Sequence, residues 1–403
     1  MLDVVETIRD FNAGREPERL ARKYTAMRTD PFVFLRGACH LFYARLPQAK
    51  VFAKAPLTWV CGDLHLENFG SYKGDNRQVY FDLNDFDEAA LAPCSWEVIR
   101  LLTSIHLAAG SLKLKREQAD HLVSSYLDAY AEALRHGKAR WIERETAEGL
   151  VGDLLNGLRG RLRPHFLDGR TERKGKHRVI RLDGKRALPV TDKQRDKVTE
   201  LIGKICAHEA DPGFYRVLDV ARRIAGTGSL GVDRYSILVE GKGSPDGNYF
   251  LDLKQAMPSS LIPHLDVEQP EWANEAARVV GVQQRMQAIS QAFLRAVTMG
   301  RKSFVLRGLQ PTEDRVALAH WDGKLERLEC VLAVMGRLTA WAQLRSSGRE
   351  GSATADELIR FGEKSRWPWQ LRELAVECAD RTRRDWKAYG KAYDKGAFKV
   401  ETA

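Results

Sequence analysis

CGDLHLENFG, residues 61–70, places two carboxylates, a histidine and an amide between two glycines. Buried hydrophobic segments do not have this composition, so the stretch is expected to be a solvated turn, a metal site or a catalytic loop. The flanking stretches LTWVC at 57–61 and QVYFDL at 78–83 predict short strands, because β-branched and aromatic residues predominate in them. The loop therefore leaves one strand, and Asp82 lies on the polar side of the next.

The spacing of the acidic and amide residues indicates a particular chemistry. Asn68 follows Asp63 by five positions, and Asp82 follows Asn68 by fourteen. Phosphoryl transfer requires a carboxylate that orients a hydroxyl, followed by an amide and a second carboxylate that hold Mg²⁺ against phosphate oxygens. We therefore predict Asp63 as the catalytic residue and Asn68 and Asp82 as metal ligands, with Asp85 as the second choice in LNDFDE. His65 is expected to brace the loop.

The same residues carry a resemblance to a known family. GDLHLEN resembles HGDxHxxN, the catalytic loop of aminoglycoside phosphotransferases and related protein-kinase-like enzymes, and FDLNDFDEA resembles their metal-binding aspartate segment. Cys61 stands where that loop has its first histidine. Over most of the chain, PFVFLRG, CGDLHLENFG, FDLNDFDEA and ARVVGVQQRMQ resemble the bacterial domain of unknown function 2252 family. The resemblance implies a kinase-like fold with ATP and Mg²⁺ as cofactors, and it leaves the substrate open.

A kinase-like site also needs a lobe that covers the nucleotide, and its elements occur downstream of the loop. GTGSLG at 226–231 is a GxGxxG turn between strand-like segments, and Lys254 ends the strand YFLDLKQ. A glycine-rich hairpin without a ligand is the alternative, and a Rossmann turn is disfavoured because a strand follows. The predicted nucleotide-binding residues are Gly226, Thr227, Gly228, Ser229, Gly231 and Lys254. The next helix should supply an acidic partner for Lys254, and Glu275 is favoured over Glu271.

This order predicts an α+β fold, namely a protein-kinase-like two-lobed fold in circularly permuted order. Residues 1–210 are expected to form a helical catalytic lobe that carries the catalytic loop, the metal-binding strand and a basic insertion at about 159–188. Residues 211–312 are expected to form a nucleotide-binding β lobe with one long helix. Residues 313–403 are expected to be helices that complete the catalytic lobe.

Composition sets further bounds on what the chain does. Of 403 residues, 44% are hydrophobic and 29% charged, as in ordinary globular proteins. No apolar run is long enough for a membrane span, and the N-terminus does not resemble a signal peptide, so a cytoplasmic protein is expected. Six scattered cysteines without paired spacing predict free thiols.

The formal charge of +10 is concentrated in one segment. Residues 159–188 hold eleven Lys and Arg against three Asp and Glu. The segment is either a solvated hairpin or a docking surface for an anion. Few aromatic residues are interleaved with the basic ones, so nucleic acid is an unlikely partner.

Three functions follow in order of preference. The first is an ATP- and Mg²⁺-dependent phosphotransferase that transfers the γ-phosphoryl group to a hydroxyl acceptor of unknown identity, with a small molecule slightly favoured over a protein. The second is a nucleotide-binding pseudokinase or a nucleotidyl transferase on the same fold. The third is a basic nucleic-acid-binding protein that uses residues 159–188.

Overall fold

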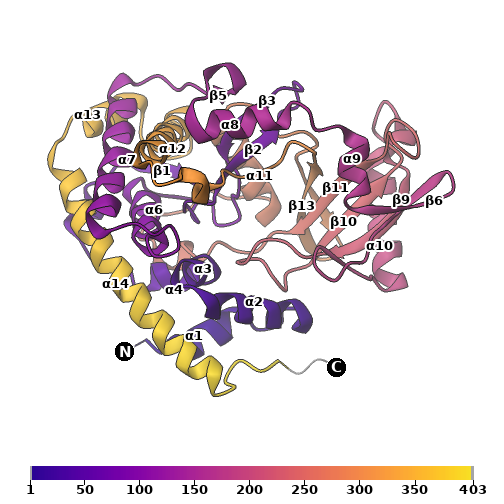
Figure 1. Ribbon diagram of the computed structural model, residues 1–403, viewed down its shortest axis with the longest axis horizontal. Helices are drawn as coiled ribbons and strands as arrows, with labels where there is room; N and C mark the ends of the chain where they lie inside the picture. The colour runs from indigo at the N-terminus through magenta and orange to yellow at the C-terminus, as the bar shows by residue number, and fades with distance from the viewer. Residues whose placement is uncertain (1, 401–403) are drawn as a thin grey trace.

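The structure is a computed structural model that describes residues 2–400. Helices dominate one half of the molecule, and a six-stranded antiparallel sheet dominates the other (Figure 1). The expected α+β class is confirmed. All six cysteines are free thiols, as predicted. Within the described residues, no helix has both the length and the apolar character that crossing a membrane requires.

The helical half is built around α6 (Ser95–Ala108), which is buried along nearly its whole length. Thirteen of its residues are buried; most are apolar, and the buried polar ones include Glu97 and Arg100, which contact the loop at 61–70. Helices α7 and α12 pack closely where a Cβ atom on Gly336 would lie 2.4 Å from the carbonyl oxygen of Tyr126. The helices of this half are α1 (Val4–Phe11), α2 (Pro17–Thr29), α3 (Pro31–Gly37), α4 (Cys39–Ala44), α5 (Lys50–Ala53), α6 (Ser95–Ala108), α7 (Arg116–His136), α8 (Gly149–Leu158), α12 (Leu325–Arg345), α13 (Ala355–Gly362) and α14 (Arg366–Asp394).

Short strands inside the helical half position the loop at 61–70. The predicted strands near 57–61 and 78–83 are present, but they belong to different sheets. β1 (Leu57–Val60) pairs with β4 (Ala90–Pro93), and β3 (Val79–Leu83) lies between β2 (Phe69–Lys73) and β5 (Ile142–Glu143). The loop therefore connects two small sheets. Residues 85–88 after β3, which we call the acidic segment, return beside the loop.

The six-stranded sheet has the order β12-β13-β11-β10-β9-β8. Its strands are β8 (Ala187–Leu188), β9 (Val217–Arg223), β10 (Arg234–Val239), β11 (Tyr249–Gln255), β12 (Arg295–Met299) and β13 (Lys302–Leu309). Alternation along β11 sends Leu251 and Leu253 into an apolar cluster with Ile202 of α10 (Asp192–Cys206). Asp252 and Lys254 lie on the opposite face, toward the helical half.

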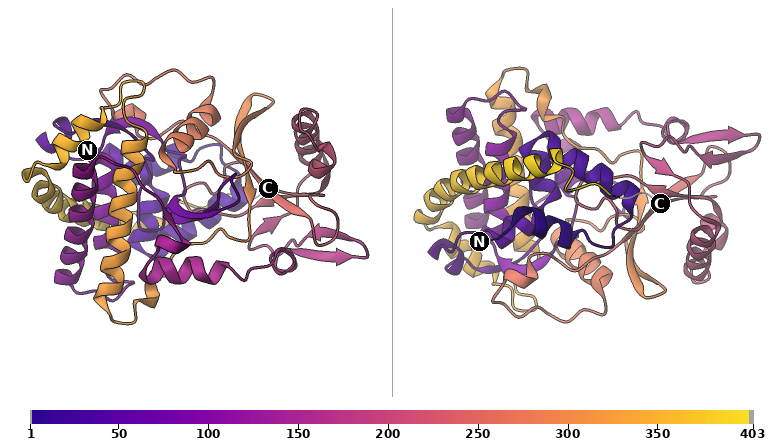
Figure 2. Two further views of the ribbon diagram at one scale, coloured as in Figure 1. Left: turned by 90° about the horizontal axis from the view of Figure 1, so that it is seen from above. Right: turned by 90° about the horizontal axis from the view of Figure 1, so that it is seen from below.

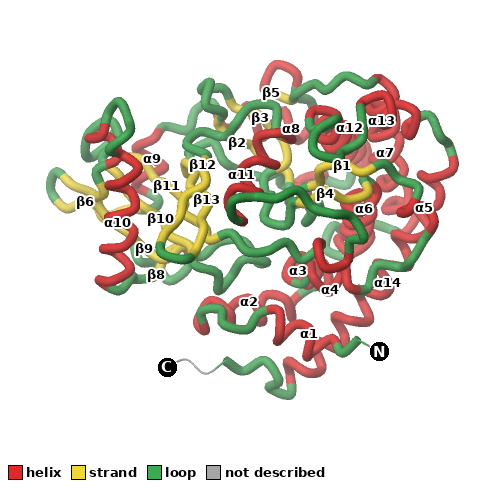
Figure 3. Tube along the Cα trace, turned by 180° about the vertical axis from the view of Figure 1, so that it is seen from behind, coloured by secondary structure: helices red, strands yellow, loops and turns green. Residues whose placement is uncertain are grey.

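α11 (Glu275–Met286) packs between this sheet and the helical half, in contact with β12, β13 and α12 (Figure 3). Viewed from above and below, the sheet lies on one side of the molecule and the long helices lie on the other (Figure 2). The three segments expected from the sequence thus fold into two halves.

The expected boundary at residue 210 is wrong, because the segment before it belongs with the sheet. β8 pairs with β9, and α10 covers one sheet face. α9 (Arg163–Asp168) and the hairpin of β6 (Thr171–Lys174) and β7 (His177–Ile180) pack against the other face. The basic segment is therefore part of the sheet half.

Candidate functional site

The catalytic-loop segment and the glycine turn meet around one cavity of 260 Å³ between the two halves of the molecule. The two segments are more than 150 residues apart in the chain. Seven of the sequence-predicted site residues line the cavity, namely Asp63, Asn68, Asp85, Gly226, Thr227, Gly228 and Ser229. The sequence motifs therefore converge in space.

A glycine fixes the start of the loop. Gly62 has a φ of +83°, and a Cβ atom there would lie 2.1 Å from the carbonyl oxygen of Glu88. The Tyr43 hydroxyl donates to the carbonyl oxygen of Gly62 at 2.6 Å. Only glycine permits this conformation and this approach, so the loop is held directly against the acidic segment.

Asp63 is held by a buried arginine of α6. Nε of Arg100 donates to Oδ1 of Asp63 at 2.8 Å, and Nη2 of Arg100 contacts the same oxygen and the carbonyl oxygen of Leu35. Burial raises the pKa of Asp63, and the Arg100 charge opposes that rise. Because both contacts use Oδ1, Oδ2 is the oxygen available to a group in the cavity.

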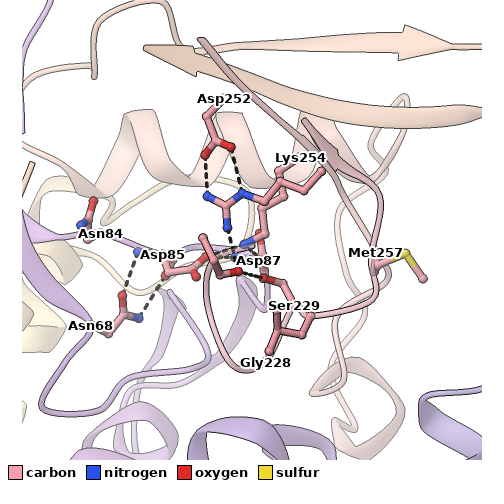
Figure 4. A network of polar contacts seen from close by, with 12 residues as sticks. Asn68, Asn84, Asp85, Asp87, Gly228, Ser229, Asp252, Lys254 and Met257 are labelled. Atoms are coloured by element: carbon pink, nitrogen blue, oxygen red, sulfur yellow. Dashed lines mark hydrogen bonds and ion pairs between the residues drawn. The ribbon is translucent and has the colours of Figure 1, made fainter. Parts of the chain in front are cut away.

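Asn68 joins the loop to the acidic segment. Its side-chain Nδ2 donates to the carbonyl oxygens of Asp63 at 3.0 Å and Asp85 at 3.1 Å. Its Oδ1 accepts from the backbone N–H of Asp85 at 2.8 Å, as Figure 4 shows. The amide thus ties the backbones of the two segments together, and its Oδ1, which was predicted as a metal ligand, accepts the backbone N–H of Asp85.

Lys254 reaches across from the sheet to the acidic segment. Its Nζ lies 3.5 Å from Oδ1 of Asp85 and forms an ion pair with Asp87 (Figure 4). The lysine side chain is only 8% exposed, so this ion pair is shielded from solvent on the lysine side. Lys254 and Asp85 were predicted as site residues from separate motifs, and the structure places them in contact.

Glu275 is not the partner of Lys254, contrary to expectation. It occupies the first turn of α11, where its carboxylate pairs with Arg278 three residues later at 2.7 Å. Arg278 also donates to the carbonyl oxygens of Asp87 and Met257. The helix therefore contacts the acidic segment through an arginine, and Glu275 serves as the partner of that arginine.

Asp82 lies outside the cavity, which corrects its predicted place as the first metal ligand. It is buried on β3, where its Oδ2 accepts from Nη2 of Arg345 at 2.9 Å and from the backbone N–H of Ala288. Burial raises its pKa, and the Arg345 charge lowers it. The carboxylates of this segment that do line the cavity are those of Asp85, Asp87 and Glu88.

The glycine turn is held by the N-terminal part of the chain, through Arg15 in the turn before α2 and Lys23 of α2. Nη1 of Arg15 and Nζ of Lys23 donate to the carbonyl oxygen of Gly228 at 2.7 and 2.9 Å. The carbonyl oxygen of Gly231 accepts from the backbone N–H of Glu16 at 2.9 Å, and Gly231 itself does not line the cavity. Sequence reasoning missed these contacts, because single basic residues in and beside a helix resemble an ordinary solvated surface.

The carboxylates at the cavity decide whether the predicted Mg²⁺ fits the site. Among residues 2–400, no group of three or more His, Cys, Asp and Glu side chains is arranged to hold a metal ion by itself. Mg²⁺ is usually held by one or two carboxylates together with substrate phosphates, so the carboxylates of Asp85 and Asp87 fit that mode of binding.

A buried carboxylate supports the loop from below. Glu97 of α6 accepts from the backbone N–H of Cys61 at 2.9 Å and from Nε2 of Gln343 at 2.6 Å. Burial raises the pKa of Glu97 to about 7 from an ordinary value of 4.5. The unfolded chain therefore releases this proton at lower pH than the folded chain, and the contribution of Glu97 to stability falls as pH rises from about 4.5 to about 7.

We expect Glu97→Gln to remove this pH dependence. A shift of this size corresponds to about 3 kcal/mol across the interval, at about 1.4 kcal/mol for each pH unit. Urea unfolding of the wild type and the variant at about pH 5 and about pH 8 measures it. Glu117→Gln is the control and should leave the pH dependence unchanged, because Glu117 is exposed on α7 and has no ion-pair partner among the described residues. If the free energy of unfolding changed equally between the two pH values in the wild type and in Glu97→Gln, the raised pKa would not belong to Glu97.

Comparison with known proteins gives one match. Residues 15–392 match the family described as an uncharacterized protein conserved in bacteria (DUF2252). No curated protein and no solved structure matches the chain. Since the match covers nearly the whole chain, this protein belongs to the DUF2252 family.

Proposed function

We propose that this protein is an ATP- and Mg²⁺-dependent phosphotransferase that transfers a γ-phosphoryl group to a hydroxyl acceptor. The observation that carries the proposal is the contact of Lys254 with Asp85 and Asp87 at a cavity that Asp63 and the glycine turn also line. A base, metal-binding oxygens, a lysine and a glycine turn are the parts that phosphoryl transfer requires.

Each side chain has a role in this proposal. Oδ2 of Asp63 orients and deprotonates the acceptor hydroxyl, and Arg100 fixes the carboxylate. Asn68 holds the two carboxylate segments in register. Asp85 and Asp87 would hold Mg²⁺, which would supply positive charge to neutralise the phosphates. Lys254 and the backbone of the glycine turn bind the nucleotide phosphates.

The order of elements in the sheet half supports a circularly permuted kinase-like fold. The glycine turn joins β9 to β10, Lys254 lies on β11, α11 follows, and β13 returns beside β11. Protein kinases use a glycine-rich loop, a strand lysine and then a helix before their catalytic loop. Here the catalytic loop comes first, and a fold can keep one site when its chain order changes.

Labelled ATP tests the proposal and separates it from nucleotidyl transfer. Purified protein is incubated with Mg²⁺ and ATP labelled at the α or the γ position, in the presence of a small-molecule extract. We expect the γ label to move into a product and the α label to remain in the nucleotide as ADP forms. Chelation of Mg²⁺ should stop both the transfer and the formation of ADP. Transfer of the α label would support nucleotidyl transfer instead, and binding without release of either label would support a pseudokinase.

A further inference from the structure

A second cavity lies on the same sheet face as Lys254 and shares no lining residue with the candidate site. It has a volume of 150 Å³. Its floor includes Phe250, which alternates with Asp252 and Lys254 along β11, and Leu309 of β13. Its rim is formed by the basic segment between α9 and β8. We call it the arginine cavity.

Positive charge dominates the lining of the arginine cavity. Four arginines and one carboxylate line it, namely Arg170, Arg181, Arg186, Arg223 and Asp183. Oδ1 of Asp183 accepts three backbone N–H groups of its own loop, from Lys185, Arg186 and Ala187. Its negative charge is therefore directed at the loop backbone.

Two of the arginines have no carboxylate partner among the described residues. Arg170 stacks over the ring of Phe166, with its Cζ 4.1 Å from the ring centroid. Arg186 donates from Nη1 to the carbonyl oxygen of Gly169 at 3.1 Å. These contacts orient the guanidinium groups without neutralising them, and each group keeps further N–H donors for a ligand.

Arg170 and Arg223 are also partly buried, and Arg170 lies close enough to Arg186 for their charges to oppose each other. Burial lowers the pKa of Arg170, and the positive charge of Arg186 lowers it further. Burial lowers the pKa of Arg223 to about 10, although Asp252 lies 2.7 Å away and raises it. The opposite charge of a bound anion would offset the cost of desolvation and reduce the mutual repulsion.

The chemistry of the lining identifies the class of ligand. Guanidinium groups present planar pairs of N–H donors that match the oxygens of a phosphate. The remaining walls are mostly apolar and include Ile180, Ile224 and Phe250. We propose that the arginine cavity binds the phosphate group of a small phosphomonoester whose carbon part lies against these apolar side chains.

Calorimetric titration of the full chain with phenyl phosphate and with inorganic phosphate tests this site. We expect saturable binding of both, and tighter binding of phenyl phosphate because its ring covers the apolar wall. The double variant R170Q/R186Q should weaken both affinities by about tenfold or more, because it removes charge-assisted hydrogen bonds. The control R301Q/R372Q removes the same charge from exposed positions and should stay within about twofold of the wild type.

The outcomes separate this proposal from the proposed function. R170Q/R186Q should keep the ATP affinity of the wild type, since neither arginine lines the candidate site. The single variants Arg170→Gln and Arg186→Gln, each checked by thermal unfolding, cover the case in which the double variant does not fold. Absence of saturable binding, or equal weakening by the two double variants, would overturn the site. Equal affinities for phenyl phosphate and inorganic phosphate would overturn the proposal of a phosphomonoester and indicate free phosphate as the ligand.

Discussion

Asp63→Asn is expected to slow phosphoryl transfer by about 10²- to 10⁴-fold while nucleotide affinity changes by less than about threefold. The amide keeps the shape of the carboxylate but cannot take a proton from the acceptor. Asp63 lines the cavity on the side of the helical half, whereas Lys254 and the glycine turn come from the sheet half. The variant therefore separates catalysis from nucleotide binding, which transfer assays and calorimetric ATP titration measure.

The variant also leaves the buried Arg100 without its counter-charge, so folding must be checked by thermal unfolding. Asp75→Asn is the matched control, because Asp75 is exposed in the turn between β2 and β3 and should behave as wild type. Transfer at the wild-type rate by folded Asp63→Asn would exclude Asp63 as the base. Joint loss of transfer and nucleotide binding would instead indicate a structural role.

Local residue patterns predicted the parts of the site that depend on side-chain type and spacing. Asp63 and Asn68 were found because a polar loop between strands is unusual. The glycine turn and Lys254 were found because turn, hairpin and lysine occur in order. All of these residues meet around one cavity or beside it. Their roles stay predictions, whereas their proximity is a property of the fold.

The errors arose where the answer depends on a distant partner. Alternation placed Asp82 on one face of β3, but it could not show that Arg345 covers that face. Helix spacing permits the pair of Glu275 with Arg278 one turn later, but it could not show that Lys254 faces Asp87 instead of this helix. The segment before residue 210 is helical and basic like its neighbours, and only the pairing of β8 with β9 assigns it to the sheet. Sequence periodicity gives a face, and tertiary packing decides what that face contacts.

Lys254→Met is expected to weaken ATP binding and to destabilise the protein by about 2 kcal/mol near neutral pH. The lysine is nearly buried and compensates two carboxylates, so its removal leaves Asp85 and Asp87 to repel each other. The solvent exposure of Asp85 keeps the cost below that of a fully buried pair. Loss of the phosphate contact should weaken nucleotide affinity by about tenfold or more.

The pH dependence of this loss has a definite sign. Desolvation at the cavity raises the pKa of Asp85 and of Asp87, and the Lys254 charge lowers both. For Asp85, Lys254 and two arginines outweigh desolvation and bring the pKa below its ordinary value. A carboxyl group with a lowered pKa stabilises the fold above its unfolded-state pKa, and this contribution is lost as pH falls through the folded-state pKa. The stability difference between the wild type and Lys254→Met should therefore narrow in acid, which urea unfolding measures.

Lys302→Met is the matched control. Lys302 lies on β13, the strand next to that of Lys254, and forms an exposed ion pair with Asp233 at 2.7 Å, so its loss should lower the stability by less than about 1 kcal/mol. If the two variants lost equal stability and both bound ATP as the wild type does, the contact between the sheet and the acidic segment would have no part in nucleotide binding.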